Sequence, residues 1–187
     1  MTFTAGQRLT AAALNAAFAS TPQLISTVTL AGTQATVPFS VVSGVYSRLT
    51  LYWRAMLSTT GSADITLQVD GNSGNNYSWV KNEAHNNTVT WQDSSTATNV
   101  IKIGVVSGSA ASFFGSGYQM IEGWSTTTGY LTCSGTYGNF NGIGAALDWA
   151  GVANGVYETA GPHSSLTVGV STASFAAGSV FALYGLT

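Results

Sequence analysis

Residues 46–79 carry the pattern that most constrains the fold, because apolar and polar side chains alternate there in two successive runs. In the first run the apolar positions are Leu49, Leu51, Trp53, Ala55 and Leu57. In the second run they are Ile65, Leu67 and Val69. Successive side chains of a strand point to opposite faces, so each run predicts a strand with one buried face. We expect the two strands to pair as a hairpin and to form the spine of a β-sandwich.

The chain from Leu24 onward continues in the same way, with short apolar-rich runs separated by Gly, Ser and Asn turns. The predicted strands are Leu24–Leu30, Ala35–Phe39, Tyr46–Ser58, Ala63–Val69, Tyr77–Lys81, Thr88–Gln92, Asn99–Val105, Ala111–Met120, Tyr130–Thr136, Val152–Glu158, Leu166–Val170 and Val180–Tyr184. Such regular spacing is typical of an all-β fold, either an antiparallel β-sandwich or a jelly roll. The glycines of residues 139–151 favour a loop, with one helical turn at residues 145–149 as the alternative.

The first twenty residues differ from the β region, because residues 10–18 hold strong helix formers and no Gly or Pro. Thr10 is a suitable N-cap, and Leu9 can contact Leu14 across the first turn. Leu14 and Phe18 lie four positions apart and share one face of the predicted α-helix. A helix of about ten residues is marginally stable alone in water, so it needs a surface to pack on.

Two interpretations of this helix stay open: it rests on its own sandwich, or it is an assembly peptide. Pro22 separates the helix from the β region. We predict an attachment or oligomerisation segment at residues 1–22, acting through Leu9, Leu14 and Phe18, and a β-sandwich domain at residues 23–187.

The composition limits the classes of function. Charged residues make up 6% of the 187 residues, against about 25% in an average protein. The five basic residues are scattered, which argues against a nucleic-acid partner. No apolar run reaches the length of a membrane span, and the N-terminus has no apolar signal core. The net charge of −2 gives little repulsion between copies and so favours an oligomer.

No catalytic motif emerges from the sequence, and we predict that the protein is not an enzyme. Glu122 beside Trp124, and Asp148, are the acids that a depolymerase would use, but the seven acids are isolated in sequence. The Gly-x-Ser-x-Gly motif that carries the nucleophilic serine of many hydrolases is absent. The two histidines that could act as a base, His85 and His163, fall in polar segments.

We predict no cofactor and no metal site. The loop at residues 70–76, which reads DGNSGNN, has oxygen-bearing side chains at alternate positions, as calcium loops do. It fails the EF-hand pattern because Asn75 and Lys81 stand where Gly and Glu are required. Turn chemistry explains it better, since Asp, Asn and Gly tolerate left-handed conformations. The single cysteine, Cys133, can form no disulfide within the chain and excludes a cysteine-based zinc cluster.

Aromatic side chains near Asn-rich segments can bind sugars, with flat rings for stacking and amides for hydrogen bonds. Core packing is the alternative explanation for most of them. The candidate ligand-binding residues gather where two predicted strands meet across an Asn-rich turn. They are Tyr77, Trp79, His85, Asn86 and Trp91.

Three pieces of the chain resemble virion proteins of double-stranded DNA phages, particularly phages of actinobacteria. Residues 3–15 (FTAGQRLTAAALN) resemble the start of many such proteins. Residues 46–79 resemble a β-sandwich module of phage tail fibres, including its Ser-Gly-x-Asn-Tyr core at residues 73–77. Residues 70–72 read Asp-Gly-Asn where the module has Asn-Gly-Asp. Residues 176–187 (AAGSVFALYGLT) resemble its last strand.

The resemblance implies a non-enzymatic virion component that forms a homo-oligomer, most often a trimer. The predicted function is a tail-fibre or tail-tip receptor-binding protein that recognises a glycan of the host surface. The segment at residues 1–22 would then contact other virion proteins. A capsid or tail decoration protein is the alternative, because the chain lacks a long fibrous shaft, and a polysaccharide depolymerase is the third hypothesis. The expected localisation is the virion, after synthesis in the host cytoplasm.

Overall fold

The computed structural model describes residues 21–187 apart from 42, 86–88, 109–113 and 140–148. These described residues form twelve strands and no helix. The strands are β1 (Gln23–Thr29), β2 (Thr36–Ser40), β3 (Arg48–Ala55), β4 (Gly61–Val69), β5 (Tyr77–His85), β6 (Val89–Thr98), β7 (Ile101–Gly108), β8 (Gly115–Glu122), β9 (Leu131–Asn139), β10 (Trp149–Tyr157), β11 (Ser165–Val170) and β12 (Val180–Leu186). The prediction of an all-β fold is confirmed. The described residues include no helix of the length and apolar character needed to cross a membrane.

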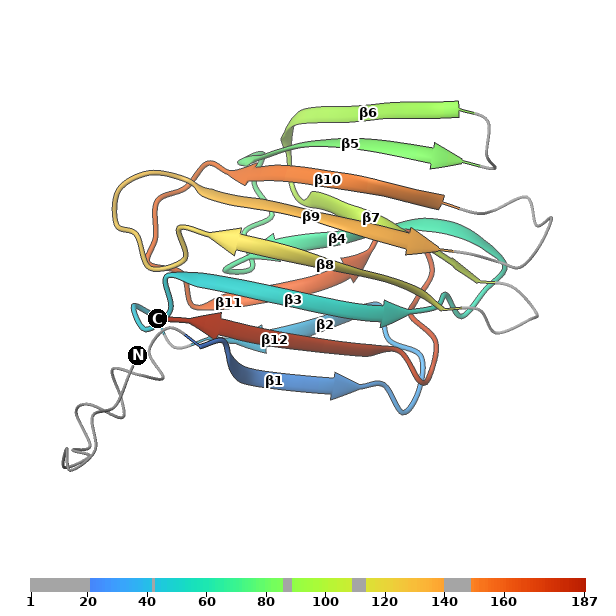
Figure 1. The fold of residues 1–187 in the computed structure, drawn as a ribbon, viewed down its shortest axis with the longest axis horizontal. Helices are drawn as coiled ribbons and strands as arrows, with labels where there is room; N and C mark the ends of the chain where they lie inside the picture. Colours follow the sequence, from blue (N-terminus) through green and yellow to red (C-terminus); the bar gives the residue numbers. More distant parts are fainter. Residues whose placement is uncertain (1–20, 42, 86–88, 109–113, 140–148) are drawn as a thin grey trace, which may run out of the picture.

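The strands form two antiparallel sheets that lie one behind the other (Figure 1). The larger sheet has eight strands in the order β1-β12-β3-β8-β9-β10-β5-β6. The smaller sheet has four strands in the order β2-β11-β4-β7. Because the larger sheet extends further, β5 and β6 form an edge that continues beyond the strands of the smaller one (Figure 1).

The pairing between strands is nested, so that early strands pair with late ones. β1 pairs with β12, β2 with β11, β3 with β8, and β4 with β7. Two antiparallel pairs interrupt this scheme: β5–β6 lies between β4 and β7 in the chain, and β9–β10 between β8 and β11. Both pairs add to the larger sheet and meet through β10 and β5.

The core lies between the two sheets and is built from the inward positions of alternating strands. Leu51 and Trp53 of the larger sheet, and Ile65 and Leu67 of the smaller sheet, are at most 3% exposed. Gly104 of β7 leaves room for the Trp53 ring, because a side-chain carbon there would lie 2.8 Å from it. The apolar half of each alternating run therefore faces the opposite sheet.

The predicted hairpin of residues 46–69 is wrong, since β3 and β4 belong to different sheets. β3 pairs with β12 and β8, whereas β4 pairs with β11 and β7. The chain between them crosses from one sheet to the other. Alternation identifies a strand with one buried face, but strands that face each other across a core show the same pattern as strands paired side by side.

The twelve predicted strands each overlap one observed strand. β5 and β6 continue past the predicted ends at Lys81 and Gln92 to His85 and Thr98. Their extra residues are mostly polar, because the outer side of the sheet there is exposed. The predicted N-terminal helix, with Leu9, Leu14 and Phe18, lies outside the described residues, and so does most of the alternative helical turn at residues 145–149.

The loop after β4 is a hydrogen-bonded turn, as its Asp, Asn and Gly content predicted. Asp70 and Gly71 have positive φ angles of 52° and 64°. The Asn72 backbone N–H donates to the Val69 carbonyl at 2.9 Å, and the Asn72 side chain accepts from the Gly74 N–H at 2.7 Å. The structural interpretation of this loop is confirmed.

Candidate functional site

The outer face of the eight-stranded sheet gathers most of the exposed large apolar side chains. Residues paired directly across neighbouring strands share a face, and one such row runs from Ala182 through Tyr52, Tyr118 and Thr136 to Val152. Of the seven exposed large apolar side chains among the described residues, five lie on this face. They are Leu24, Tyr52, Tyr118, Met120 and Val152.

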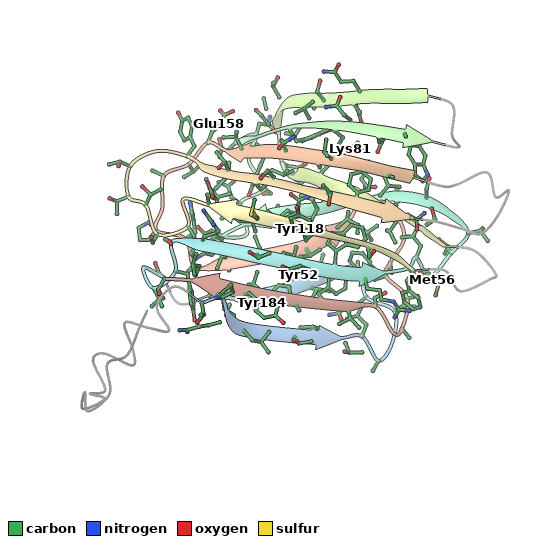
Figure 2. The ribbon with its side chains drawn as sticks, viewed as in Figure 1. Tyr52, Met56, Lys81, Tyr118, Glu158 and Tyr184 are labelled. Atoms are coloured by element: carbon green, nitrogen blue, oxygen red, sulfur yellow. The ribbon has the colours of Figure 1, made fainter. Side chains whose placement is uncertain are left out.

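Three tyrosines stand side by side on β12, β3 and β8 (Figure 2). The Tyr52 ring centroid lies 6.1 Å from that of Tyr118 and 5.7 Å from that of Tyr184, the latter in an edge-to-face arrangement. Tyr52 is 50% exposed and Tyr118 is 37% exposed. We call the outward positions of these strands the tyrosine face: Thr50, Tyr52, Tyr118, Met120, Ala182 and Tyr184.

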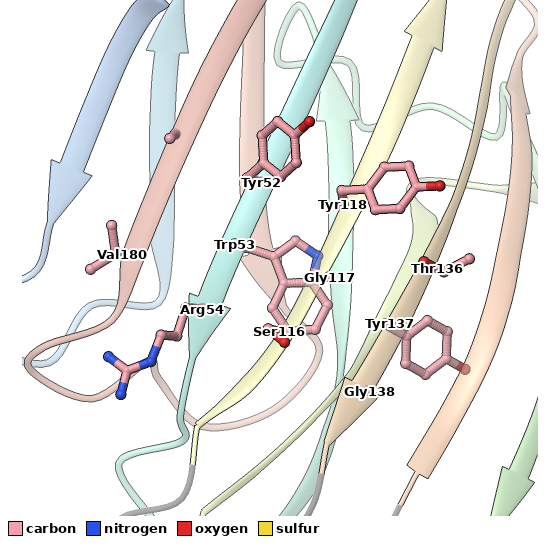
Figure 3. Close-up of a pocket in the computed structure, with 11 residues that line it drawn as sticks. Tyr52, Trp53, Arg54, Ser116, Gly117, Tyr118, Thr136, Tyr137, Gly138 and Val180 are labelled. Atoms are coloured by element: carbon pink, nitrogen blue, oxygen red, sulfur yellow. The ribbon is translucent and has the colours of Figure 1, made fainter.

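Two hollows open on the tyrosine face. The first, of about 580 Å³, lies over β12, β3, β8 and β9, and Tyr52, Tyr118, Ser116 and Thr136 are among the residues that line it (Figure 3). The second, of about 470 Å³, is lined by Pro22, Thr50, Tyr52, Ala182 and Tyr184. We call the second hollow the Pro22 groove, because the described chain begins at its edge.

The rest of the outer face, over β9, β10, β5 and β6, carries small polar side chains together with valines such as Val152. A third hollow of about 470 Å³ lies there. The hydroxyl and amide groups that line it are those of Ser78, Ser94, Ser95, Thr96, Thr132, Ser134 and Asn154. This part of the sheet offers hydrogen-bonding groups without large exposed rings, in contrast to the tyrosine face.

Charge is sparse on the tyrosine side of the sheet. Arg48 and Glu122 pair at 2.6 Å at one end of β3 and β8, with both side chains about half exposed. At the other end the Arg54 guanidinium lies 3.8 Å from the centre of the Phe114 ring. Glu122 is thus paired with a charged partner, and Trp124, its neighbour in the sequence, is fully buried.

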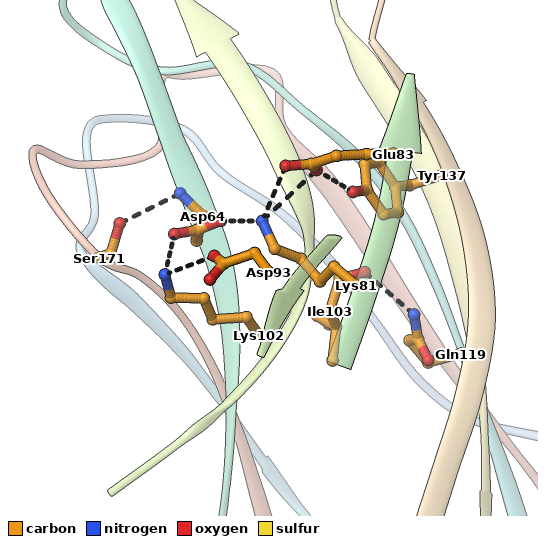
Figure 4. A network of polar contacts seen from close by, with 9 residues as sticks. All are labelled: Asp64, Lys81, Glu83, Asp93, Lys102, Ile103, Gln119, Tyr137 and Ser171. Atoms are coloured by element: carbon orange, nitrogen blue, oxygen red, sulfur yellow. Dashed lines mark hydrogen bonds and ion pairs between the residues drawn. The ribbon is translucent and has the colours of Figure 1, made fainter. Parts of the chain in front are cut away.

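A second unusual group lies on the inner side of the same sheet, near its β5–β6 edge (Figure 4). We call it the lysine cluster: Asp64, Lys81, Glu83, Asp93, Lys102 and Tyr137. The Lys81 ammonium lies 2.6 Å from Asp64 and 3.4 Å from Glu83. Lys102 lies 2.8 Å from Asp64 and 3.6 Å from Asp93, and the Tyr137 hydroxyl donates a hydrogen bond to Glu83.

Burial and neighbouring charge set the ionisation of this cluster. Burial raises the pKa of the Tyr137 hydroxyl, and the Glu83 carboxylate raises it further, so this group stays protonated as a donor. For Lys102, burial acts to lower the pKa, but the Asp64 and Asp93 carboxylates outweigh it and the pKa rises. The cluster therefore combines two lysine side chains, three carboxyl groups and a hydroxyl that donates to one of them.

The lysine cluster is best explained as a structural device. Lys81 and Glu83 have side chains that are 3% and 6% exposed, and each is paired with an opposite charge. A buried polar network that satisfies its members fixes the packing of the strands that contribute to it. Here it joins β4 and β7 of the small sheet to β5, β6 and β9 of the large sheet. The cleft beside it, of about 540 Å³, is lined by these paired groups and by apolar residues such as Val105 and Trp149.

The structure places two of the predicted ligand-binding residues inside the core. Tyr77 is fully buried, and its hydroxyl oxygen lies 3.1 Å from the Val69 carbonyl oxygen and 3.0 Å from that of Asn72, either of which accepts its one proton. Trp79 is 7% exposed, and its ring lies 4.6 Å from the Lys102 ammonium. Neither ring has a free face for a sugar, so the stacking role predicted for these two residues does not fit their positions.

The other three predicted ligand residues lie at or next to the end of β5 and β6. His85 ends β5, and Trp91 is in β6, paired with Glu83 rather than with Trp79. Asn86 lies outside the described residues, and so do the side chains of His85 and Trp91. Beside this end, Asn82 and Gln92 pair with each other and are exposed.

His163 is buried, although its sequence neighbours are polar. It is 1% exposed and lies against the Trp124 and Tyr157 rings. Its Nδ1 atom is 2.9 Å from the Asp70 carboxylate, which also accepts from the Ser164 and Ser165 backbone N–H groups. This contact fastens the loop after β4 to the chain before β11, so His163 is a structural residue in this fold.

The described residues include no group of three or more His, Cys, Asp or Glu side chains arranged to hold a metal ion. Burial raises the pKa of the Cys133 thiol to about 12, and a thiol held protonated is a poor nucleophile.

The alternation of residues 49–57 places Tyr52 on the outward side of its strand, but it does not bring Tyr52 together with Tyr118 and Tyr184. The available signal was that Tyr118 and Met120, and likewise Ala182 and Tyr184, alternate with buried residues. That pattern places each pair outward, but it does not show that β12, β3 and β8 are neighbours.

The chain was compared with protein-family models, with curated proteins and with solved structures, and none of the three comparisons found a match.

Proposed function

We propose that this chain is a surface protein of a phage particle that works by binding, as a homo-oligomer and without catalysis. The observation that carries the proposal is the outer face of the eight-stranded sheet, where exposed tyrosine and methionine side chains gather and charge is sparse. Interface cores are enriched in Tyr, Met and Arg and depleted in Lys, Glu and Asp. The resemblance of residues 3–15, 46–79 and 176–187 to virion proteins supports the same assignment.

The fold assignment that accompanies this function is a β-sandwich of the jelly-roll type. The nested pairing of β1 with β12, β2 with β11, β3 with β8 and β4 with β7 supports it. In a jelly roll one long antiparallel hairpin wraps into two facing sheets, which gives this nesting. The pairs β5–β6 and β9–β10 would then be additions to the common eight strands.

Receptor binding at a tail fibre or tail tip is the first candidate role. Its proposed site is the end of β5 and β6, where exposed Asn82 and Gln92 adjoin the predicted residues His85, Asn86 and Trp91. Amide side chains donate and accept hydrogen bonds, as recognition of a neutral glycan requires. The charge-poor surface suits a ligand that carries no charge of its own.

The decisive experiment tests adsorption. Purified protein should compete with the phage for host cells and reduce adsorption, and Asn82→Ala with Gln92→Ala should weaken this competition. Thr36→Ala, at an exposed site on β2 of the other sheet, should leave it unchanged. Protein that never reduces adsorption at saturating concentration would contradict receptor binding.

A decoration protein of the capsid or tail is the second candidate. The tyrosine face favours it, because an extended, charge-poor face suits permanent contact with neighbouring subunits. Electron microscopy of particles labelled with antibody against the chain separates the two roles. Label at the tail tip supports the receptor role, and label spread over the capsid or along the tail supports decoration.

Homotrimer formation is part of the proposal. Sedimentation of the purified chain at micromolar concentration should show a species of three times the chain mass. A stable monomer at that concentration would contradict it.

A further inference from the structure

The first hollow on the outer face, which we call the Arg54 hollow, holds a positive charge that has no acidic partner among the described residues. We propose that this hollow binds one acidic sugar, a pyranose ring that carries a carboxylate. The site is separate from the receptor site proposed at the end of β5 and β6. The inference depends neither on adsorption nor on the oligomeric state.

Arg54 differs from the other basic side chains that the structure describes. Arg48, Lys81 and Lys102 each lie within 2.8 Å of a carboxylate, whereas no described carboxylate pairs with Arg54, which is exposed. Arg54 is also the one charged residue among the described residues that line the hollow. An anionic ligand would therefore meet a cation there, and no lining carboxylate would repel it.

The Arg54 guanidinium is positioned so that its donors stay available. Its central carbon lies 3.8 Å from the centre of the Phe114 ring, which is close enough for a cation–π contact. A guanidinium over a ring uses its flat face for that contact, while its N–H groups point outward in its own plane. A carboxylate can then accept two parallel hydrogen bonds from Arg54 without displacing Phe114.

Two exposed rings provide the surface for the sugar ring. Tyr52 and Tyr118 line the hollow, with ring centroids 6.1 Å apart and planes inclined by 36°. Tyr52 lies two positions before Arg54 on the same face of β3, which separates the two backbone positions by about 7 Å. The carboxylate of such a sugar is bonded directly to the ring. A pyranose with its C–H groups against Tyr52 would therefore present the carboxylate toward Arg54.

Small residues beside the tyrosines give the hollow its depth. Ser116 pairs with Arg54 across β3 and β8, and Gly138 pairs with Ser116 across β8 and β9. The resulting space of about 580 Å³ falls within the range of about 300–1,000 Å³ that is typical of small-molecule sites. The Ser116 and Thr136 hydroxyls line it (Figure 3) and can donate and accept hydrogen bonds with sugar hydroxyls.

Three probes test the proposal on the full chain. Methyl glucuronide carries both the ring and the carboxylate, methyl glucoside carries only the ring, and acetate carries only the carboxylate. Dissociation constants are measured by ligand-observed NMR titration. We expect the glucuronide to bind at least about tenfold more tightly than either of the other probes. Equal binding of the glucuronide and one of the others, or no binding of the glucuronide in the millimolar range, would overturn the proposal.

A matched pair of arginine variants locates the site. Arg54→Gln should abolish the preference for the glucuronide over the glucoside. Arg48→Gln should keep that preference, because Arg48 lies at the other end of β3 and pairs with Glu122. Neither arginine belongs to the core, so both variants should fold. A preference that survives Arg54→Gln would place the carboxylate elsewhere and contradict the proposal.

A second pair of variants tests the contact with the sugar ring. Tyr118→Ser should weaken glucuronide binding several-fold, whereas Tyr130→Ser, at a tyrosine that is 60% exposed and does not line the hollow, should not. Unchanged binding in Tyr118→Ser would mean that the sugar ring does not lie in the hollow, and the proposal would be wrong. Adsorption and sedimentation are measured separately, so failure here does not decide the proposed function.

Discussion

The lysine cluster and the tyrosine face lie on opposite sides of one sheet and differ in how their side chains are partnered. On the inner side, Lys81 is 3% exposed and lies between Asp64 and Glu83. On the outer side, Tyr52 is half exposed, and its ring partners are Tyr118 and Tyr184 of the same face. Both groups depart from the ordinary distribution of residues, in which charge is outside and large apolar surface is inside.

The difference shows why an unusual group of residues is not by itself a functional site. Charges placed inside are costly unless each is paired, and in the lysine cluster the paired groups compensate one another within the fold. Exposed rings have no such internal compensation and gain most from contact with another surface. The lysine cluster therefore explains how the two sheets are held together near the β5–β6 edge, and the tyrosine face is the surface where we propose that a partner binds.

Replacing Lys81 should have the largest effect on stability. Lys81→Met leaves Glu83 and Asp64 with less compensation inside the fold, and the loss of one partner of a buried pair costs about 3–5 kcal/mol. Urea denaturation would measure the free energy of unfolding. Lys102→Met is the control, because that side chain is 28% exposed and should cost much less. Equal losses for the two variants would mean that burial of the charge does not govern the cluster.

Removing the Tyr137 hydroxyl should have the next largest effect. Tyr137→Phe keeps the ring but removes a donor to the buried Glu83 carboxylate, at a cost of about 1–3 kcal/mol. Tyr130→Phe, at an exposed ring, should change the free energy of unfolding very little. An unchanged stability in Tyr137→Phe would show that Glu83 is satisfied without this hydrogen bond.

Asp70 lies between the two regions in exposure: its carboxylate is less buried than the Lys81 side chain and less exposed than Tyr52. It also accepts several hydrogen bonds. Burial acts to raise its pKa, but the Ser164 N–H, His163 and the Ser165 N–H outweigh burial and hold the pKa below the ordinary 3.8. A lowered pKa means that the fold favours the ionised form. The stabilisation is complete above pH 3.8 and is lost as the pH falls through the lower pKa of the folded state.

Asp70→Asn should therefore lose about 1 kcal/mol at neutral pH, and the gap between wild type and variant should narrow as the pH falls below 3.8. Denaturant curves at several pH values would measure both effects. A gap that stays constant down to pH 2 would show that ionisation of Asp70 is not the source of the stabilisation.

The strands could be predicted from the sequence because alternation and turn residues are local signals. All twelve were found, and the left-handed turn at Asp70 and Gly71 followed from residue type. The neighbours of each strand could not be predicted in the same way, and β3 was assigned to the wrong partner. Alternation reports that one face is buried, whereas the choice of neighbour depends on contacts far apart in the chain.

The same limit explains what was missed at the two sites. Lys81 and Glu83 occupy the same face of β5 as buried Tyr77 and Trp79. Their inward direction could therefore be predicted from the alternation of side chains along a strand. Their partner Asp64 lies on a strand of the other sheet, which no local pattern indicates. Likewise, the tyrosine face exists because three strands from distant parts of the chain are neighbours.

Substitutions on the tyrosine face should have the smallest effect on stability. They also distinguish this face most clearly from the lysine cluster. Tyr118→Ser with Met120→Ser removes two side chains that are each 37% exposed, so the free energy of unfolding should change by about 1 kcal/mol or less. If the face joins copies of the chain, the double variant should sediment as a smaller species than the wild type, while Tyr130→Ser should not. A variant that stays fully associated, or one that unfolds as readily as Lys81→Met, would show that these side chains serve the fold and not a partner.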